Sequence, residues 1–196
     1  MKVKGRLRVV RFDDSIQEQD GICRLALESK IKKIKAVGDI KAKQIDVVDA
    51  YFKGRINIQN IETKELYIIG EITAKKIFAE KFMCEFSGNS TAEVVTANKV
   101  YFKPEDNDEN IINNFIGRML GRKISIFTMH KNDNFKICCI NADDVFIQNT
   151  EVDYVAGKRI VIGKHSAVKE VVYTESLKVF PNASVENIKR VSRRRL

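Results

Sequence analysis

The sequence predicts an all-β fold, a β-helix (solenoid) with turns of about 17 residues and one short amphipathic α-helical insertion. Glycine recurs at steps of 17, 16, 16 and 18 residues through the first half of the chain. These glycines are Gly21, Gly38, Gly54, Gly70 and Gly88. A repeat of this length indicates one supersecondary unit stacked on copies of itself. Function is therefore to be sought on a repetitive surface before it is sought in a pocket.

Apolar and polar residues alternate in short runs around each glycine. Leu66, Ile68 and then Ile72 illustrate this period of two, which is typical of half-buried strands and not of helices. A turn of about 17 residues holds three short strands with tight corners, where glycine adopts a positive φ without a steric clash. The chain has only two prolines, Pro104 and Pro181, as expected if most backbone N–H groups donate to a strand ladder.

The C-terminal part repeats at the same length with different residues. At an offset of 17 positions, Ile160, Ile162, Val168 and Val171 recur as Leu177, Val179, Val185 and Ile188. Ala142, Val145 and Ile147 look like the preceding turn. An ordinary β-sandwich with coincidental spacing is the alternative interpretation.

Residues 104–121 interrupt the repeat. Asp106 and Glu109 have the spacing of a capping box without its Ser or Thr, and Gly121 suits the position that follows a helix. Apolar residues between them fall at helical spacing and predict a helix of about three turns. Its docking face consists of Ile112, Phe115, Ile116 and Met119. This face packs on its own chain, the simpler interpretation, or meets a partner.

The predicted organisation is one elongated solenoid with an insertion. N-terminal solenoid turns occupy 1–103, the helical insertion 104–121, C-terminal solenoid turns 122–191 and a basic tail 192–196. Residues 123–129 and 135–140 alternate on either side of a polar turn, which predicts a β-hairpin.

The formal net charge of +9 is concentrated at the two ends of the sequence. Ten basic residues lie before the first acidic residue, Asp13, or after the last one, Glu186. They are Lys2, Lys4, Arg6, Arg8, Arg11, Lys189, Arg190, Arg193, Arg194 and Arg195. The remaining 25 Lys and Arg are balanced by 26 Asp and Glu. These basic ends contact anionic lipid, bind polyanions non-specifically or keep the termini soluble, and the sequence leaves all three open.

The sequence predicts a cytoplasmic protein, with membrane association through the basic ends as an option. No apolar run of about 15 residues follows the basic N-terminus, so neither a signal peptide nor a membrane span is expected. Cys23, Cys84, Cys138 and Cys139 form no regular framework, which favours a reducing compartment. Cys84 and Cys139 are expected in the core, and the cysteines lack the paired spacing of metal ligands.

No catalytic pattern emerges, so we expect neither enzymatic activity nor a cofactor or small-molecule substrate. His130 lies beside a polar turn and His165 at an expected corner, so both are expected to be solvated. The Gly-Lys pairs at 157–158 and 163–164 lack the spacing of a phosphate loop. Without tryptophan, and with scattered Phe and Tyr, a platform for single-stranded nucleic acid is not favoured.

Three C-terminal stretches carry a family resemblance. They are INADDVFIQNT (140–150), VAGKRIVIG (155–163) and VVY (171–173). Together with the glycine-anchored turns, they resemble the bactofilins, bacterial polymer-forming cytoskeletal proteins, and in particular the longer Firmicute-type members. The N-terminal turns resemble this family only in period and glycine placement. The chain departs from the family in its sparser glycines, its insertion and its charged tails.

The resemblance implies a right-handed triangular β-helix that assembles end to end into filaments without nucleotide. It also implies a scaffolding role in cell shape, envelope or motility-organelle assembly. Physical reasoning leads to self-assembly as well, because each open end of a β-helix offers unpaired backbone groups to another copy. The residues expected at the two ends are Val185, Ile188 and Val191, and Val3, Leu7 and Val9.

The expected function is thus that of a non-enzymatic structural protein whose main partner is itself. Like charge in both tails would oppose stacking at low salt, so assembly is expected to be promoted by salt. The alternative is a monomeric solenoid that docks on an anionic membrane or nucleic acid through its basic termini. An enzyme that uses a solenoid groove is a third interpretation, but no column of clustered Asp, His or Arg supports it.

Overall fold

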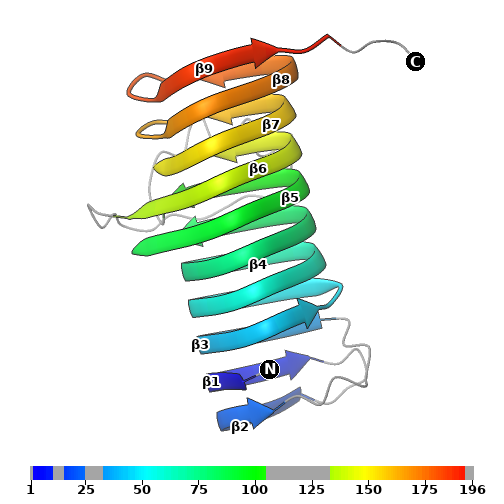
Figure 1. Cartoon of the computed structure of the whole chain (residues 1–196). Coiled ribbons are helices and arrows are strands. Elements are labelled where there is room, and N and C mark those ends of the chain that lie inside the picture. Colours follow the sequence, from blue (N-terminus) through cyan, green and yellow to red (C-terminus); the bar gives the residue numbers. More distant parts are fainter. Residues whose placement is uncertain (1, 11–15, 25–32, 105–132, 193–196) are drawn as a thin grey trace.

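The computed structural model of this chain describes residues 2–10, 16–24, 33–104 and 133–192. All described strands belong to one sheet in the order β2-β1-β3-β4-β5-β6-β7-β8-β9, and the sheet coils into a β-solenoid of about eight turns (Figure 1). The strands are β1 (Lys2–Val10), β2 (Ile16–Arg24), β3 (Lys33–Asp46), β4 (Asp49–Phe86), β5 (Asn89–Pro104), β6 (Asn134–Ile147), β7 (Thr150–Ile162), β8 (Ala167–Val179) and β9 (Ser184–Arg190). The described ranges contain no helix.

From β3 onward all neighbouring strands are parallel, and like residues lie above one another. Gly38 pairs with Gly54, and Ala167 pairs with Ser184. The pairs predicted at an offset of 17 are all register partners: Ile160 with Leu177, Ile162 with Val179, Val168 with Val185 and Val171 with Ile188. Parallel strands one turn apart are the arrangement that a repeat of this length demands. The prediction of a β-solenoid with turns of about 17 residues is therefore confirmed.

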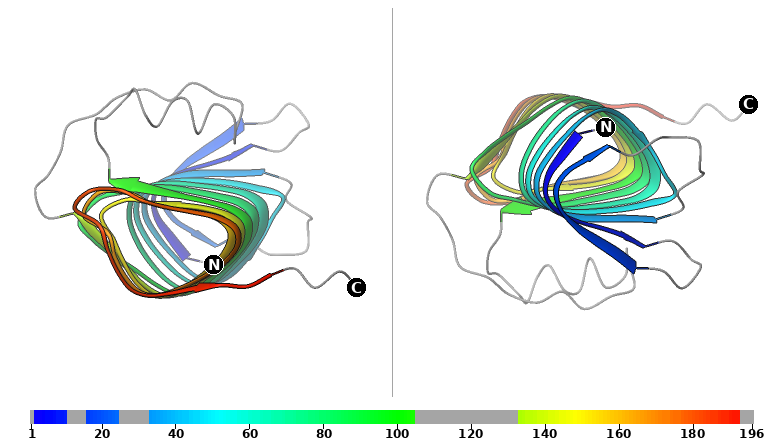
Figure 2. Two further views of the ribbon diagram at one scale, coloured as in Figure 1. Left: turned by 90° about the horizontal axis from the view of Figure 1, so that it is seen from above. Right: turned by 90° about the horizontal axis from the view of Figure 1, so that it is seen from below.

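The core fills the inside of the coil along its whole length. Viewed along the axis, the turns enclose one continuous interior (Figure 2). Phenylalanine rings pack edge-on or tilted against one another there, with ring centroids 4.8 Å apart for Phe82 and Phe102 and 5.0 Å apart for Phe102 and Phe135. Cys84 is fully buried among them, as predicted. Cys139 is only half-buried, so its assignment to the core is wrong; the inward residues here are Ile137 and Ile140, and the two cysteines between them are not buried.

The corners at which the coil changes direction take two forms, one inside the long strands β3 and β4 and one between later strands. Gly38, Gly54 and Gly70 have φ values of 111°, 118° and 121°, and a Cβ on Gly70 would overlap the carbonyl oxygen of Gly54. From Gly88 onward the corner holds a left-handed residue instead, with φ between 49° and 64°. These later residues are Gly88, Asn149, His165 and Asn182. The glycine series of the sequence therefore joins two different corners, which explains its longer last step.

The N-terminal strands do not continue the parallel coil. β1 pairs antiparallel with β3 on one side, with Val3 opposite Ile40, and antiparallel with β2 on the other. Gly21 lies opposite Gly5 in this pair of strands and not at a solenoid corner. Solenoid turns therefore begin at β3 and not at the start of the predicted range 1–103. Alternating apolar and polar residues suit either strand direction, so the sequence could not distinguish the two.

Several predictions concern residues outside the described ranges. Of the predicted helical insertion 104–121, only Pro104 is described, as the last residue of β5. The docking face Ile112, Phe115, Ile116 and Met119 lies outside the described residues. The predicted hairpin is wrong for 135–140, because this stretch belongs to β6, which has parallel neighbours on both sides. Within the described part of the chain, no helix is long and apolar enough to cross a membrane.

Candidate functional site

The C-terminal end of the solenoid is an open sheet edge. β9 pairs with β8, and no described strand pairs with its other side. The second half of β8, from Ser176 to Val179, pairs only with β7. The last turn is thus bare at the end of the molecule (Figures 1 and 2). Unpaired backbone groups of this kind are a template for another strand.

Apolar side chains accompany this open edge. The side chains of Val179, Ile188 and Val191 are 39%, 56% and 40% exposed, respectively, whereas most apolar residues of earlier turns are buried. Val185 is half-buried and packs against the core. Ile188 continues the inward column of Val171, but no further described turn lies above it. The three predicted end residues Val185, Ile188 and Val191 therefore all lie in the last turn.

The opposite end has a different construction. The outermost strand there is β2, and β1, which carries Val3, Leu7 and Val9, is an internal strand between β2 and β3. The formal charges of the two outermost strands differ in sign, because β2 contains Glu18, Asp20 and Arg24 and β9 contains Glu186, Lys189 and Arg190.

The basic residues of the N-terminus are distributed along β1 and are not at the edge. The register places Arg6 opposite Asp20 and Arg8 opposite Glu18, so acids of β2 lie level with them. Lys2 and Lys4 occupy the same strand. At the other end Lys189 and Arg190 are exposed in β9, while Arg11 and residues 193–195 lie outside the described ranges.

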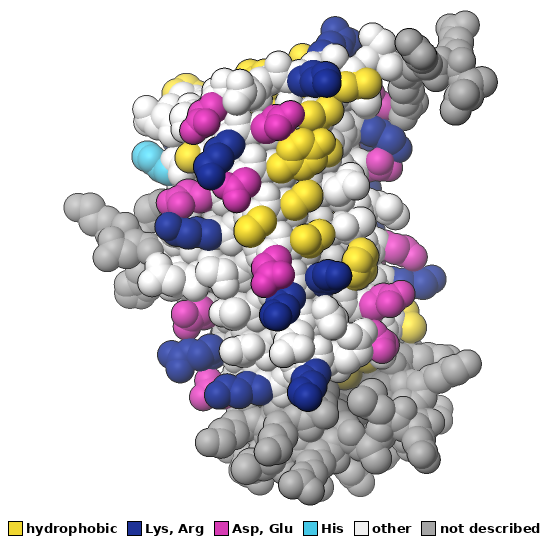
Figure 3. All heavy atoms as spheres, viewed as in Figure 1, with side chains coloured by type: hydrophobic (Ala, Val, Ile, Leu, Met, Phe, Trp, Pro, Cys, Tyr) yellow, Lys and Arg dark blue, Asp and Glu magenta, His cyan; other side chains and the backbone are white. Residues whose placement is uncertain are grey.

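Charged side chains on the sides of the coil form ion pairs between neighbouring turns, although Lys81 and Lys99 are like-charged neighbours in one column. In one column Glu65 and Lys81 are 2.8 Å apart, and Asp144 and Arg159 are 2.6 Å apart. Further pairs one turn apart are Lys33 with Asp49, Lys136 with Glu151 and Asp153 with Lys169. Cations and anions accordingly lie next to one another on the face seen in Figure 3. Opposite charges directly across neighbouring strands attract, so these ion pairs support the register.

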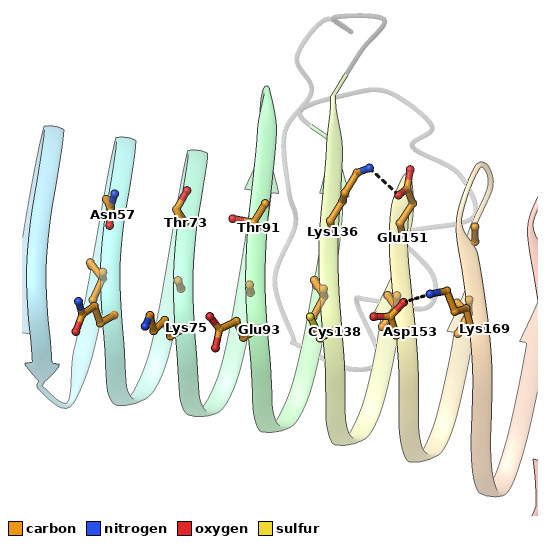
Figure 4. A pocket seen from close by; sticks show the side chains of 18 of the residues that line it. Asn57, Thr73, Lys75, Thr91, Glu93, Lys136, Cys138, Glu151, Asp153 and Lys169 are labelled. Atoms are coloured by element: carbon orange, nitrogen blue, oxygen red, sulfur yellow. Dashed lines mark ion pairs between the residues drawn. The ribbon is translucent and has the colours of Figure 1, made fainter.

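A groove of about 620 Å³ follows one face of the coil from β4 to β9. Its columns are shown in Figure 4, where Lys136 points to Glu151 and Lys169 to Asp153. The hydrogen bond from Lys136 and that from Asn134 lower the pKa of the Glu151 carboxyl. The hydrogen bond to Asp153 raises the pKa of the Lys169 ammonium. Most of the groove's charged groups thus neutralise one another.

The described residues that line the groove do not form a set suited to catalysis. No histidine or aromatic residue lines it, and its cysteine, Cys138, has no histidine beside it among the described residues. Among the described residues, no group of three His, Cys, Asp or Glu side chains could hold a metal ion. His165 is exposed at a corner with φ of 58°, as predicted, and His130 lies outside the described ranges.

A second outer face carries a column of large apolar residues that sequence reasoning missed. The column consists of Tyr51, Tyr67, Met83, Tyr101, Phe146 and Val161, and we call it the aromatic column. The ring centroids of Tyr51 and Tyr67 are 5.3 Å apart, and those of Tyr101 and Phe146 are 5.0 Å apart. The first four members follow the glycine period, so a signal was present in the sequence.

An ion pair adjoins the aromatic column on the same outer face. Lys103 Nζ lies 3.5 Å from Glu85 Oε1, and both residues are buried. Burial and then the nearby Glu85 carboxylate, which also accepts a hydrogen bond from Tyr67, raise the pKa of the Tyr67 phenol. Burial, followed by Glu85, also raises the pKa of Tyr101. Both phenols therefore remain protonated at neutral pH and can donate hydrogen bonds.

Comparison of the chain with models of known protein families, with curated proteins and with solved structures found no match. The strand pairing by itself establishes the architecture, a parallel β-solenoid with turns of about 17 residues.

Proposed function

We propose that this chain is a non-enzymatic structural protein, a bactofilin-like scaffold that assembles end to end with copies of itself. The observation that carries the proposal is the open last turn, where β9 has a free edge beside the exposed Ile188. The right-handed winding and the cytoskeletal role implied by the resemblance belong to the same proposal. A groove in which most charges are paired, and in which the described residues form no catalytic set, favours a scaffold over an enzyme.

The directions of the two outermost strands suit a head-to-tail contact. β2 is two antiparallel steps from β3 and so runs in the direction of β3, as does β9. β9 of one copy can therefore pair with β2 of the next as a parallel strand. Repetition of this heterologous contact gives an open filament, not a closed dimer. The opposite formal charges of β2 and β9 favour the same pairing.

The magnitudes indicate weak assembly that depends on concentration. Burial of the exposed halves of Val179, Ile188 and Val191 contributes about 1 kcal/mol each. Association costs about 4 kcal/mol or more in lost translational and rotational freedom. Backbone pairing along the last turn must supply the remainder. The net charge of +9 on every copy adds a repulsion, which physiological salt screens within about 8 Å.

The first experiment combines negative-stain electron microscopy with light scattering over a range of salt and protein concentrations. We expect filaments or growing oligomers that increase with salt. Ile188→Lys should abolish them, because it places a charge in the end contact. Phe78→Lys is the matched control, since Phe78 is 43% exposed but lies on β4, away from both ends. A chain that remains monomeric at high concentration and high salt would overturn the proposal, as would equal effects of the two substitutions.

Docking on an anionic surface is the second candidate, because Lys189 and Arg190 are exposed in the last strand. In this case the chain is a monomer that binds membrane or nucleic acid through its basic ends. Co-sedimentation with vesicles that contain or lack anionic lipid separates the two proposals. Docking predicts binding only to the anionic vesicles, and loss of that binding when residues 191–196 are deleted. Filaments without vesicle binding would reject it.

A further inference from the structure

The two ends of the solenoid differ in how far the core is covered. In the first parallel turn the inward side chains of Ile34, Ile40 and Ile45 are 2%, 0% and 2% exposed. Ile188 ends the inward column that Ile45 begins, and its side chain is 56% exposed. Seen along the axis from below, β1 and β2 cross part of the lower opening of the coil (Figure 2). The lower end of the core is thus closed, whereas the upper end is open.

The strand β1 occupies only part of the lower edge of β3. Its antiparallel register covers residues 35–41 of β3. Residues 42–46 pair with β4 above them, and no described strand pairs with them from below. Because β1 runs against the direction of the coil, it interrupts the parallel stacking that all later strands continue. Terminal units of this kind stop a stack of repeats from adding a further copy.

The lower edge of β3 and the free edge of the last turn belong to the same inward columns. Register partners connect the two edges from turn to turn, with the step inside β4 marked by Gly54 and Gly70. Every inward column is apolar at both ends. The ends, lower edge first, are Ile34 with Leu177, Ala36 with Val179, Ala42 with Val185 and Ile45 with Ile188. A second copy that continued the coil would therefore place apolar residues on apolar residues.

The outward columns of the two edges also match. Their ends, lower edge first, are Asp46 with Lys189, Lys43 with Glu186, Val37 with Phe180 and Lys35 with Lys178. The first two pairs are opposite in charge, the third is apolar, and only the last is like-charged. Opposite charges across neighbouring strands attract, so these pairs favour the register that continues the coil.

We propose that the lower edge of β3 is an interaction surface for the last turn of a second copy, and that β1 regulates assembly by occupying part of it. The inference rests on the proposed self-assembly and adds its regulation. With β1 in place, β2 is the outermost strand, so the end contact is the pairing of β9 with β2. Displacement of β1 allows the coil of one copy to continue directly into the coil of the next, with all strands parallel.

The first test releases β1 in the full chain by combining Val3→Pro with Leu7→Pro. Both residues lie opposite β3, and proline cannot donate to a strand ladder. We expect this variant to form filaments at a concentration at least about tenfold lower than the unaltered chain, because the contact gains a complete edge of strand pairing. Sedimentation at physiological salt measures this concentration.

The matched control for the release of β1 combines Gln19→Pro with Cys23→Pro in β2. These residues lie opposite Leu7 and Val3, so the same two positions are disrupted one strand further out. The control leaves β1 on the edge of β3. It should therefore not lower the concentration at which filaments form.

The second test exchanges one charge pair between copies of the variant with released β1. Lys189→Glu in one preparation and Asp46→Lys in another should each raise the concentration needed for filaments, because like charges then meet at every contact. An equal mixture of the two should restore assembly, because alternating copies again bring opposite charges together. A contact through β2 would not be rescued in this way, since Asp46 lies in β3.

Two results would overturn the inference. One is that release of β1 leaves the chain folded, by circular dichroism, yet does not lower the concentration needed for filaments. The other is that the mixture assembles no better than its two components. Should the double variant not fold, Leu7→Pro alone replaces it, with a smaller decrease expected. An unaltered chain that stays monomeric at high concentration and high salt would instead overturn the proposed function, and the variant with released β1 would still decide this inference.

Discussion

The corners of the early turns and those of the late turns change the direction of the chain in physically different ways. In the early turns Gly54 and Gly70 stack backbone on backbone, and a Cβ on Gly54 would lie 2.5 Å from the carbonyl oxygen of Gly38. In the late turns the corner residue is left-handed but has space, since a Cβ on Gly88 would come no closer than 3.7 Å to Glu71. The early corner therefore requires glycine, whereas the late corner accepts Asn149 and His165.

The largest effect should come from breaking the early corner. Gly70→Ala combines an unfavourable positive φ with backbone overlap, and we expect it to lower the free energy of unfolding by about 3 kcal/mol or more. Gly88→Ala adds only the φ cost, about 1–2 kcal/mol. Urea denaturation followed by circular dichroism measures both. Equal losses would mean that the two corners do not differ as described.

The next largest effect on stability is expected from breaking ion pairs in one charged column, one pair in the late turns and one in the early turns. Arg159 pairs with Asp144, whose side chain is only 6% exposed, so Arg159→Met removes from a buried carboxylate the cation that lies 2.6 Å away, while Lys99 remains as its register partner in the preceding turn. We expect a loss of about 2 kcal/mol in the free energy of unfolding, below the loss of about 3–5 kcal/mol for a fully buried pair, because Arg159 is half-exposed. Lys81→Met breaks the exposed pair with Glu65 in the same column and should cost less than about 1 kcal/mol. Urea titration of both variants tests whether the buried ion pair contributes more to the free energy of unfolding than the exposed one.

A smaller effect is expected at the late corner. His165→Gly relieves a left-handed φ of 58° but adds backbone freedom to the unfolded chain. Because these terms oppose each other, the melting temperature should change by the equivalent of less than about 1 kcal/mol. A loss as large as that of Gly70→Ala would show that His165 makes contacts that its exposed position does not suggest.

The smallest effect should be in the pH dependence of the ladder on the groove face. Hydrogen bonds from Lys136 and Asn134 lower the pKa of Glu151 in the folded state. Its contribution to stability is therefore present above the unfolded pKa, near 4.5, and is lost as pH falls through the lower folded pKa. Stability measured between about pH 5 and pH 3 should decline slightly less for Glu151→Gln than for the unaltered chain. A steeper decline in the variant would contradict this sign.

Much of the coil could be predicted because in-register stacking repeats the same environment at a fixed interval. Ile160 and Leu177 occupy the same inward position, so their spacing in the sequence equals the length of one turn. The aromatic column was missed even though Tyr51, Tyr67 and Met83 share this interval. Its members occupy outward positions, where the alternation along a strand normally places polar side chains. The residues between Pro104 and Asp133 also separate Tyr101 from Phe146 in the sequence. A period search cannot follow a column across such an interruption.

The sequence by itself determined the solenoid, its period and the pairing of its C-terminal turns, because inward side chains must recur once per turn. Only the tertiary structure decided that β2 and not β1 is outermost, since alternation along a strand carries no information about its direction. It also decided which charges become partners. Asp144 and Arg159 are 15 residues apart in the chain, and they meet because one turn places them in the same column.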